Sequence, residues 1–113
     1  MASYKVEKSS VKVSWDEQPA DLFKVGFGDP AQNDVIVRDA VKALDDLGEL
    51  HGAMALINGP ASLPAAAVLI HRLSHRYETI AVFDPKLSAY VVVIPHGNQW
   101  LLGDLIRMDN VKA

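Results

Sequence analysis

Residues 53–64, AMALINGPASLP, contain the end of one predicted element and the start of another. The uninterrupted apolar run Ala53–Ile57 is typical of a central strand buried on both faces. It stops at Asn58-Gly59-Pro60, where glycine and proline favour a turn. Ser62 is a typical helix N-cap and Pro64 fits the first helical turn, so a helix is predicted to follow. The stretch therefore predicts a strand, a short loop and a helix.

Downstream of this unit the chain continues with alternating elements. The helix is predicted to extend to about Tyr77. After it we expect a strand at Thr79–Phe83 and a tight turn at Asp84-Pro85-Lys86. The hairpin partner of that strand is expected at Ala89–Ile94, and a last short strand or turn at Trp100–Met108.

Upstream, the chain opens with a period of two. Tyr4–Lys8 and Val11–Trp15 alternate apolar and polar residues as half-buried strands do, and Ser9-Ser10 is the predicted turn between them. Leu22–Phe27 alternates more weakly and ends at a strong break, Gly28-Asp29-Pro30. Three strands are therefore expected before the first helix.

A surface helix is predicted from Ala31 to Leu50. Asp29 is its expected N-cap, with Pro30 in the first turn, and Gly48 or Gly52 is its expected end. Apolar residues recur on one face at helical spacing and charged residues occupy the other, so the helix is expected to cover a sheet through Val37, Ala40, Val41, Leu44 and Leu47.

The composition limits the class of protein. The chain has 113 residues, 50% of them hydrophobic, and no cysteine. This length suits one domain, so residues 1–113 are predicted to form a single domain. The missing cysteine excludes a disulfide scaffold, a thiolate metal site and a cysteine nucleophile. No signal-like segment and no apolar run near the ~20 residues of a membrane span is found, which predicts a cytoplasmic protein with no membrane partner.

Charge is unevenly distributed along the chain. Residues 1–50 carry six basic and ten acidic side chains, whereas residues 51–113 carry five basic and four acidic ones and all four histidines. Counterion release by nucleic acid requires clustered Lys and Arg, so a broad nucleic-acid-binding face is not expected. A local anion-binding site in the second half of the chain is not excluded by this argument.

Three local features could carry chemistry. The loop Asn58–Ser62 precedes a helix N-terminus, whose unpaired N–H groups attract anions. His71 and His75 are four residues apart on the predicted helix, so both imidazoles share one face and could hold a metal or a phosphate. Asp84-Pro85-Lys86 places a carboxylate and an ammonium on a tight turn, where they could bind a metal or offset phosphate charge.

Each feature also has an ordinary structural explanation. The loop fits a capped connection, the histidines fit a solvated helix face, and aspartate and proline are common in turns for conformational reasons. His96 follows the predicted hairpin partner, and the hairpin register determines whether it returns near Asp84. No one of these features identifies a function.

Taken together, the residues resemble the third family of CRISPR-associated ring nucleases, accessory proteins of type III CRISPR systems. The resemblance covers roughly residues 53–108 and rests on the order and spacing of its blocks, which are Ile57–Pro64, His75, Ala81–Leu87, Val91–Val93, His96 and Gly103-Asp104. It implies a small α+β, ferredoxin-like domain with a mixed sheet covered by two helices.

The resemblance also implies an activity. Members of the family are metal-dependent phosphodiesterases that open cyclic tetra-adenylate, the second messenger of type III CRISPR immunity, and so switch off the antiviral response. Mn²⁺ is the implied cofactor. The implied assembly is a homodimer that forms tetramers or larger species around the ring.

The family's functional residues map onto four positions of this chain. His75 takes the place of the catalytic histidine and keeps its interval of nine positions to Asp84, which matches the family aspartate. Lys86 stands where members commonly carry arginine, which keeps the charge but loses the bidentate contact with a phosphate. His96 matches a later histidine implicated in metal or substrate contact.

A mechanism follows as an expectation. His75 is expected to act as general base or acid when a 2′-hydroxyl attacks its neighbouring phosphate, with Lys86 steadying that phosphate. Asp84 is expected to bind Mn²⁺ or to orient His75, with His96 as a second metal ligand. The ring is expected to be held by backbone N–H groups and a hydroxyl of the glycine-proline loop, that is by Asn58, Gly59, Pro60 and Ser62.

Three alternatives remain at this point. The nearest is an Mn²⁺-dependent nuclease that removes adenylates from RNA 3′ ends. A module that binds or senses the cyclic nucleotide would bind it without forming products. An interaction protein would dock a CRISPR partner through its acidic first helix, independently of nucleotide.

Overall fold

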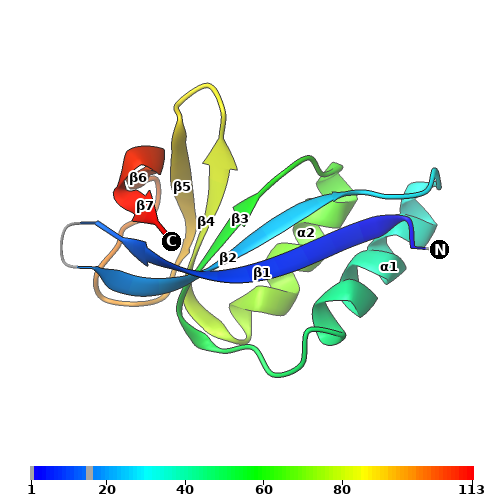
Figure 1. Cartoon of the computed structure of the whole chain (residues 1–113), viewed down its shortest axis with the longest axis horizontal. Coiled ribbons are helices and arrows are strands. Elements are labelled where there is room, and N and C mark those ends of the chain that lie inside the picture. The colour runs from blue at the N-terminus through cyan, green and yellow to red at the C-terminus, as the bar shows by residue number, and fades with distance from the viewer. Residues whose placement is uncertain (1, 15–16) are drawn as a thin grey trace.

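A seven-stranded mixed sheet forms the centre of the computed structural model, which describes residues 2–14 and 17–113. The strands are β1 Tyr4–Val13, β2 Gln18–Phe27, β3 Gly52–Asn58, β4 Tyr77–Asp84, β5 Ala89–Pro95, β6 Leu105–Arg107 and β7 Val111–Lys112. They lie in the order β6-β5-β4-β3-β2-β1-β7. Two helices, α1 Asn33–Asp45 and α2 Leu63–Ser74, lie side by side on one face of the sheet (Figure 1). Within the described residues no helix is long and apolar enough to cross a membrane.

The three central strands are parallel. β2 pairs with β3 and β3 with β4, in registers such as Phe23 opposite Ile57 and Ile57 opposite Val82. Their carboxyl ends therefore lie together, and we call this surface the carboxyl end of the sheet; the opposite surface, where β3 and β4 begin, is the amino end. The predicted α+β class, with a mixed sheet covered by two helices, is confirmed. Its connectivity consists of two successive crossovers, β2-α1-β3-α2-β4, whereas a ferredoxin-like chain uses split βαβ units.

The helices cover one half of the core. Alternate residues of the strands pack against buried residues of α1 and α2, which are Ile36, Ala40, Leu44, Ala65, Leu69 and Leu73. Of the apolar stripe predicted for the first helix, Ala40 and Leu44 are buried and the other three positions are half-buried. The predicted helix-on-sheet packing is therefore confirmed.

The second half of the core is enclosed by the sheet itself. β6 and β7 lie at opposite edges of the sheet, yet only the 3-10 turn η1, Met108–Asn110, separates them in the chain. The sheet must curl to bring its edges this close, and Trp100 packs against the buried residues inside the curl. These include Met54 and Leu56 of β3, which alternate with the helix-facing residues of that strand.

Two element boundaries upstream differ from the prediction. The expected turn at Ser9-Ser10 is wrong: β1 is continuous, with Ser9 opposite Leu22 and Ser10 opposite Asp21 in an unbroken ladder. Trp15, the expected end of the second strand, lies outside the described residues. Long-range pairing with β2 overrides the local turn preference of two serines.

The first helix is shorter than predicted at both ends. Its N-cap is Gln32 rather than Asp29, because the backbone N–H of Asp29 still donates to the carbonyl of Ala2, 3.0 Å away, beside the start of β1. It ends at Asp45, before Gly48, whose φ of +88° belongs to the following turn.

The second helix begins where predicted and ends earlier. Ser62 is the N-cap, its hydroxyl oxygen accepting the backbone N–H of Ala65 at 3.3 Å. The helix ends at Ser74 rather than at Tyr77, which is buried and pairs with Gly52 as the first residue of β4.

Candidate functional site

The loop Asn58–Ser62 lies at the carboxyl end of the sheet and is held against β2. Gly59 has a φ of +134°, and a Cβ atom there would lie 1.9 Å from the carbonyl oxygen of Val25, so only glycine fits. The hydroxyl of Tyr4 donates to the carbonyl oxygen of Pro60 at 2.7 Å. The loop is therefore positioned by β1 and β2 before any ligand arrives.

Two further contacts tie this loop to its neighbours. The side-chain amide of Asn58 donates to the hydroxyl of Tyr90 at 3.0 Å. The Ser62 hydroxyl donates to Asn33 Oδ1 at 2.7 Å, which links the N-termini of the two helices. Because a serine hydroxyl has one proton to donate, a phosphate could accept it only by displacing Asn33. Sequence reasoning missed Asn33 and Tyr90, since no local spacing relates residues 29 and 32 positions apart.

Asp84 also lies at the carboxyl end, at the tip of the β4–β5 hairpin. Its Oδ1 accepts the backbone N–H of Lys86 at 2.9 Å and that of Leu87 at 3.4 Å, which fixes the carboxylate on the turn. Within residues 2–14 and 17–113, its Oδ2 has no hydrogen-bond partner. Lys86 is exposed beside it. The predicted turn is confirmed, and it leaves one carboxylate oxygen and one ammonium available to a ligand.

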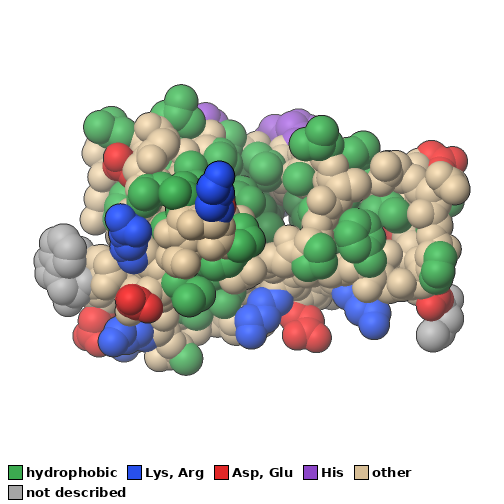
Figure 2. Space-filling model, turned by 90° about the horizontal axis from the view of Figure 1, so that it is seen from above, with side chains coloured by type: hydrophobic (Ala, Val, Ile, Leu, Met, Phe, Trp, Pro, Cys, Tyr) green, Lys and Arg blue, Asp and Glu red, His purple; other side chains and the backbone are tan. Residues whose placement is uncertain are grey.

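The histidines lie at the amino end of the sheet. His75 is the C-cap of α2, and His96 follows β5, where its backbone N–H donates to the carbonyl of Glu78 at 2.9 Å. His75 and His96 line one shallow hollow of about 290 Å³, together with Arg76. In Figure 2, the histidine side chains on the visible face lie at one margin, and the basic side chains lie away from them. The hairpin thus returns His96 to His75 and not to Asp84.

A larger hollow of about 710 Å³ adjoins His75 and is lined also by Asp45, Gly48, Arg72 and Arg76. Arg72 donates to both carboxylate oxygens of Asp45, with Nη2 2.7 Å from Oδ2. This contact lowers the pKa of Asp45 and raises that of Arg72. Arg76 forms no salt bridge in the described part of the chain, so it is the cation free to face an anion here.

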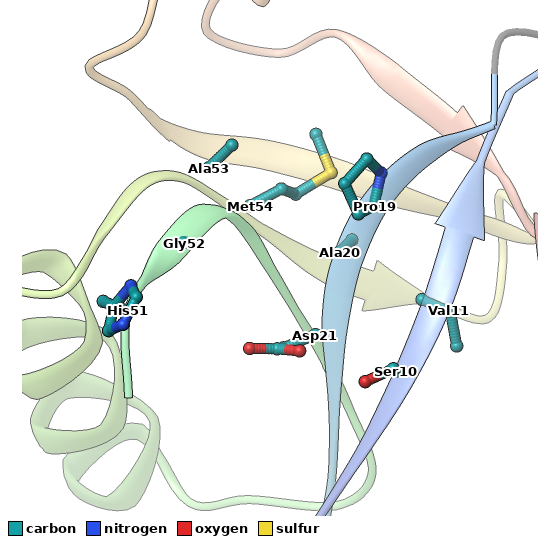
Figure 3. Close-up of a pocket in the computed structure, with 9 residues that line it drawn as sticks. All are labelled: Ser10, Val11, Pro19, Ala20, Asp21, His51, Gly52, Ala53 and Met54. Atoms are coloured by element: carbon teal, nitrogen blue, oxygen red, sulfur yellow. The ribbon is translucent and has the colours of Figure 1, made fainter. Parts of the chain in front are cut away.

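A third hollow, of about 190 Å³, lies where β3 begins and contains Asp21 and His51 (Figure 3). The hydroxyl of Tyr77 donates to Asp21 Oδ2 at 2.6 Å. Burial, followed by this hydrogen bond, raises the pKa of Tyr77. Asp21 is therefore engaged in holding a core tyrosine.

One chain does not bring the predicted catalytic residues together. His75 precedes β4 and Asp84 ends it, and seven residue steps of extended strand span about 23 Å. Asp84 and His96, the expected metal ligands, are likewise separated by the length of β5. Among the described residues no three metal-ligating side chains lie close enough to hold one ion. The candidate residues therefore form two separate groups, one at each end of the sheet.

Residues 31–107 match the family model described as CRISPR-associated protein (Cas_csx3). The matched region contains all of the predicted site residues and excludes β1 and β2. Neither the curated proteins nor the solved structures include a match to the chain.

Proposed function

The chain belongs to the Cas_csx3 family of CRISPR-associated proteins, and from this premise we propose that it is a metal-dependent nuclease that opens cyclic tetra-adenylate. Its activity would remove the second messenger of type III CRISPR immunity. The observation that carries the proposal is the carboxyl end of the sheet, which carries the glycine-proline loop, the N-termini of two helices and the turn with Asp84 and Lys86. Backbone N–H groups and an ammonium suit a phosphate-rich ring of small size.

The reaction consistent with these residues is an attack by a ribose 2′-oxygen on the adjacent phosphorus. The new bond closes a 2′,3′-cyclic phosphate, and the bond from phosphorus to the 5′-oxygen breaks. His75 accepts the 2′-hydroxyl proton or supplies one to the leaving 5′-oxygen, and Lys86 offsets charge on the phosphate.

The residues at the carboxyl end fit part of a manganese site. Asp84 Oδ2 is the available ligand of this chain, and carboxylate oxygen suits Mn²⁺. When bound, the ion would neutralise charge that develops on the phosphate. The remaining ligands would come from phosphate oxygens, water or His96 of a second chain, since His96 of the same chain lies at the other end of the hairpin.

Because His75 and Asp84 of one chain lie at opposite ends of the sheet, the proposed active site is shared between two chains. If both act on one phosphate, His75 must come from one chain and Asp84 from another, with the ring between the amino end of the first and the carboxyl end of the second. Each chain then contributes one half of two different sites.

The direct test is cleavage of cyclic tetra-adenylate with and without Mn²⁺. His75→Ala and Asp84→Ala are each expected to lower the rate by about 100-fold or more, the usual effect of losing a proton-transfer or charge-stabilising group. His51→Ala, which changes an exposed histidine at another hollow, is expected to retain the rate. Cleavage at the wild-type rate by both active-site variants would refute the proposal.

One further substrate and one further readout separate two of the alternatives from the ring nuclease. Linear poly-adenylate offered in parallel distinguishes the ring nuclease from a nuclease of RNA 3′ ends. Tight binding of the ring without product formation would instead identify a binding module.

Mixing the two inactive variants tests the shared site. A mixture of His75→Ala and Asp84→Ala chains contains sites with both residues intact and is expected to recover a substantial fraction of wild-type activity. Each variant mixed with itself is the control. A mixture as inactive as its components contradicts a site built from two chains.

A further inference from the structure

Two imidazoles at the end of α2 point their Nε2 atoms at each other. The Nε2 atoms of His71 and His75 are 3.2 Å apart, and the ring planes are inclined at 85°. The pair lies on one helical face at positions i and i+4, and both side chains are exposed. His71 lies outside the machinery described above, so its contact with the catalytic His75 has no role there.

We propose that His71 and His75 together chelate Zn²⁺ through their Nε2 atoms, and that the bound zinc blocks His75. Zinc–nitrogen bonds are about 2.0–2.1 Å long, so nitrogens 3.2 Å apart give an angle of about 100° at the metal, close to tetrahedral. Water would complete the coordination. The described residues offer no third protein ligand, so the site is a two-imidazole chelate.

The helix holds this pair in place before a metal arrives. Leu69 and Leu73 are buried and anchor the last turns of α2 against the sheet. The Ser74 hydroxyl donates to the backbone carbonyl of His71 at 2.7 Å, which closes the final turn. Chelation therefore orders only side-chain torsions, and a preorganised pair binds with less loss of entropy.

The chemistry of the pair differs from that of Asp84. Imidazole nitrogen favours Zn²⁺, Ni²⁺ and Cu²⁺, whereas Mn²⁺ prefers carboxylate and water oxygen. Arg72, between the two histidines in sequence, is neutralised by Asp45, while Arg76 beside His75 opposes any cation. The site therefore selects Zn²⁺ over Mn²⁺ because its ligands are imidazole nitrogens, and not because it carries negative charge.

Zinc binding requires both Nε2 lone pairs. A proton on either Nε2 must therefore move to Nδ1 of its own ring, or leave to solvent where a ring is cationic. His75 can then no longer accept a substrate proton at Nε2. This inhibitory consequence rests on the proposed function, whereas the zinc site itself does not.

Zinc binding is measured first, without substrate, by competition against a chromophoric chelator. Wild-type protein is expected to bind one Zn²⁺ per chain, His71→Gln at least about tenfold more weakly, and His51→Gln as wild type. NMR of the imidazole nitrogens is expected to show zinc-dependent shifts at Nε2 of His71 and His75. Equal affinity in wild type and His71→Gln, or an equal loss in His51→Gln, would overturn the site.

Inhibition is measured next, on cyclic tetra-adenylate with Mn²⁺ present. Zinc is expected to inhibit wild type at a concentration at least about tenfold lower than it inhibits His71→Gln, which cleaves normally without zinc. Zinc that binds the pair without slowing cleavage overturns the inhibitory role. Absence of ring cleavage under every condition refutes the proposed function, while the chelator titration still decides the zinc site.

Discussion

At the scale of single residues, Gly59 is the position with least freedom in the candidate site. Its backbone is close to Val25 and its φ is positive, so two separate costs oppose any side chain there. Pro60 and Asn58, by contrast, are held by hydrogen bonds to Tyr4 and Tyr90 that come from distant strands. The loop's shape is thus set by one glycine and by two tyrosines.

Gly59→Ala is expected to destabilise the protein more than substitutions at the other glycines. Strain at positive φ costs ~1–3 kcal/mol, and the overlap with the Val25 carbonyl adds to it. Gly48→Ala carries the strain alone, because nothing lies within 4 Å of its Cβ position, and Gly26→Ala carries neither cost. Urea unfolding should rank the losses of stability as Gly59, Gly48, Gly26. A Gly59→Ala variant no less stable than Gly48→Ala would contradict the close approach.

Tyr4 is expected to make the free energy of unfolding depend on pH in the alkaline range. Burial raises the pKa of Tyr4 from its ordinary 10.0 to about 12. Its contribution to stability is therefore complete below pH 10 and is lost as pH rises through 12. The free energy of unfolding is expected to fall across this window, and less steeply in Tyr4→Phe. In Tyr4→Phe, part of the slope of unfolding free energy against pH is expected to remain, because burial also raises the pKa of Tyr77. The same slope in wild type and Tyr4→Phe would exclude this origin.

At the scale of elements, α2 carries candidate site residues at each of its ends. Its first turn borders the glycine-proline loop through the Ser62 cap, and its last turn carries His71 and His75. A single helix thus contributes to both groups of candidate residues, and its rigidity positions the two groups relative to each other.

The Ser62 cap joins this helix to α1. Variants of Ser62 that keep both, one or neither of its hydrogen bonds are therefore expected to differ in stability in that order. Ser62→Ala removes the cap and the bond to Asn33, and it is expected to cost about 1 kcal/mol or more of unfolding free energy. Ser62→Thr retains an acceptor and a donor and should match wild type. Ser62→Asp retains only the acceptor and should fall between them. Chemical denaturation checks the order, and a fully stable Ser62→Ala would show that the cap contributes nothing.

At the scale of the whole molecule, the two groups of candidate residues lie at opposite ends of the sheet. A contact between the amino end of one chain and the carboxyl end of another uses two different surfaces, so it is heterologous and need not close on itself. The ligand that completes the site would also link chains.

Assembly is therefore expected to depend on the ligand. Sedimentation velocity should show a rise in mass, beyond that of a dimer, when cyclic tetra-adenylate is added to Asp84→Ala, which is expected to bind the ring but to cut it about 100-fold more slowly than wild type. A linear adenylate of the same length is the control and should cause a smaller rise. An unchanged mass with the ring would contradict assembly through opposite ends.

Local sequence was sufficient to predict many of the structural elements of this protein. The apolar run of β3, the Ser62 cap and the hairpin turn at Asp84 were all predictable, because each depends on residues within a few positions. The early turn at Ser9-Ser10 was wrong because pairing along the whole of β2 outweighs a local preference. The family match covers residues 31–107, which include these three features.

The tertiary structure was needed wherever function depends on distance. An interval of nine positions joins His75 to Asp84 in sequence, but most of that interval is β4, an extended strand about 23 Å long that separates them. The register of the β4–β5 hairpin brings His96 back to the amino end of the sheet. Sequence therefore determined which chemical groups this protein carries. Strand direction and pairing determined which of those groups can meet, because side chains act only on what lies within a few ångströms.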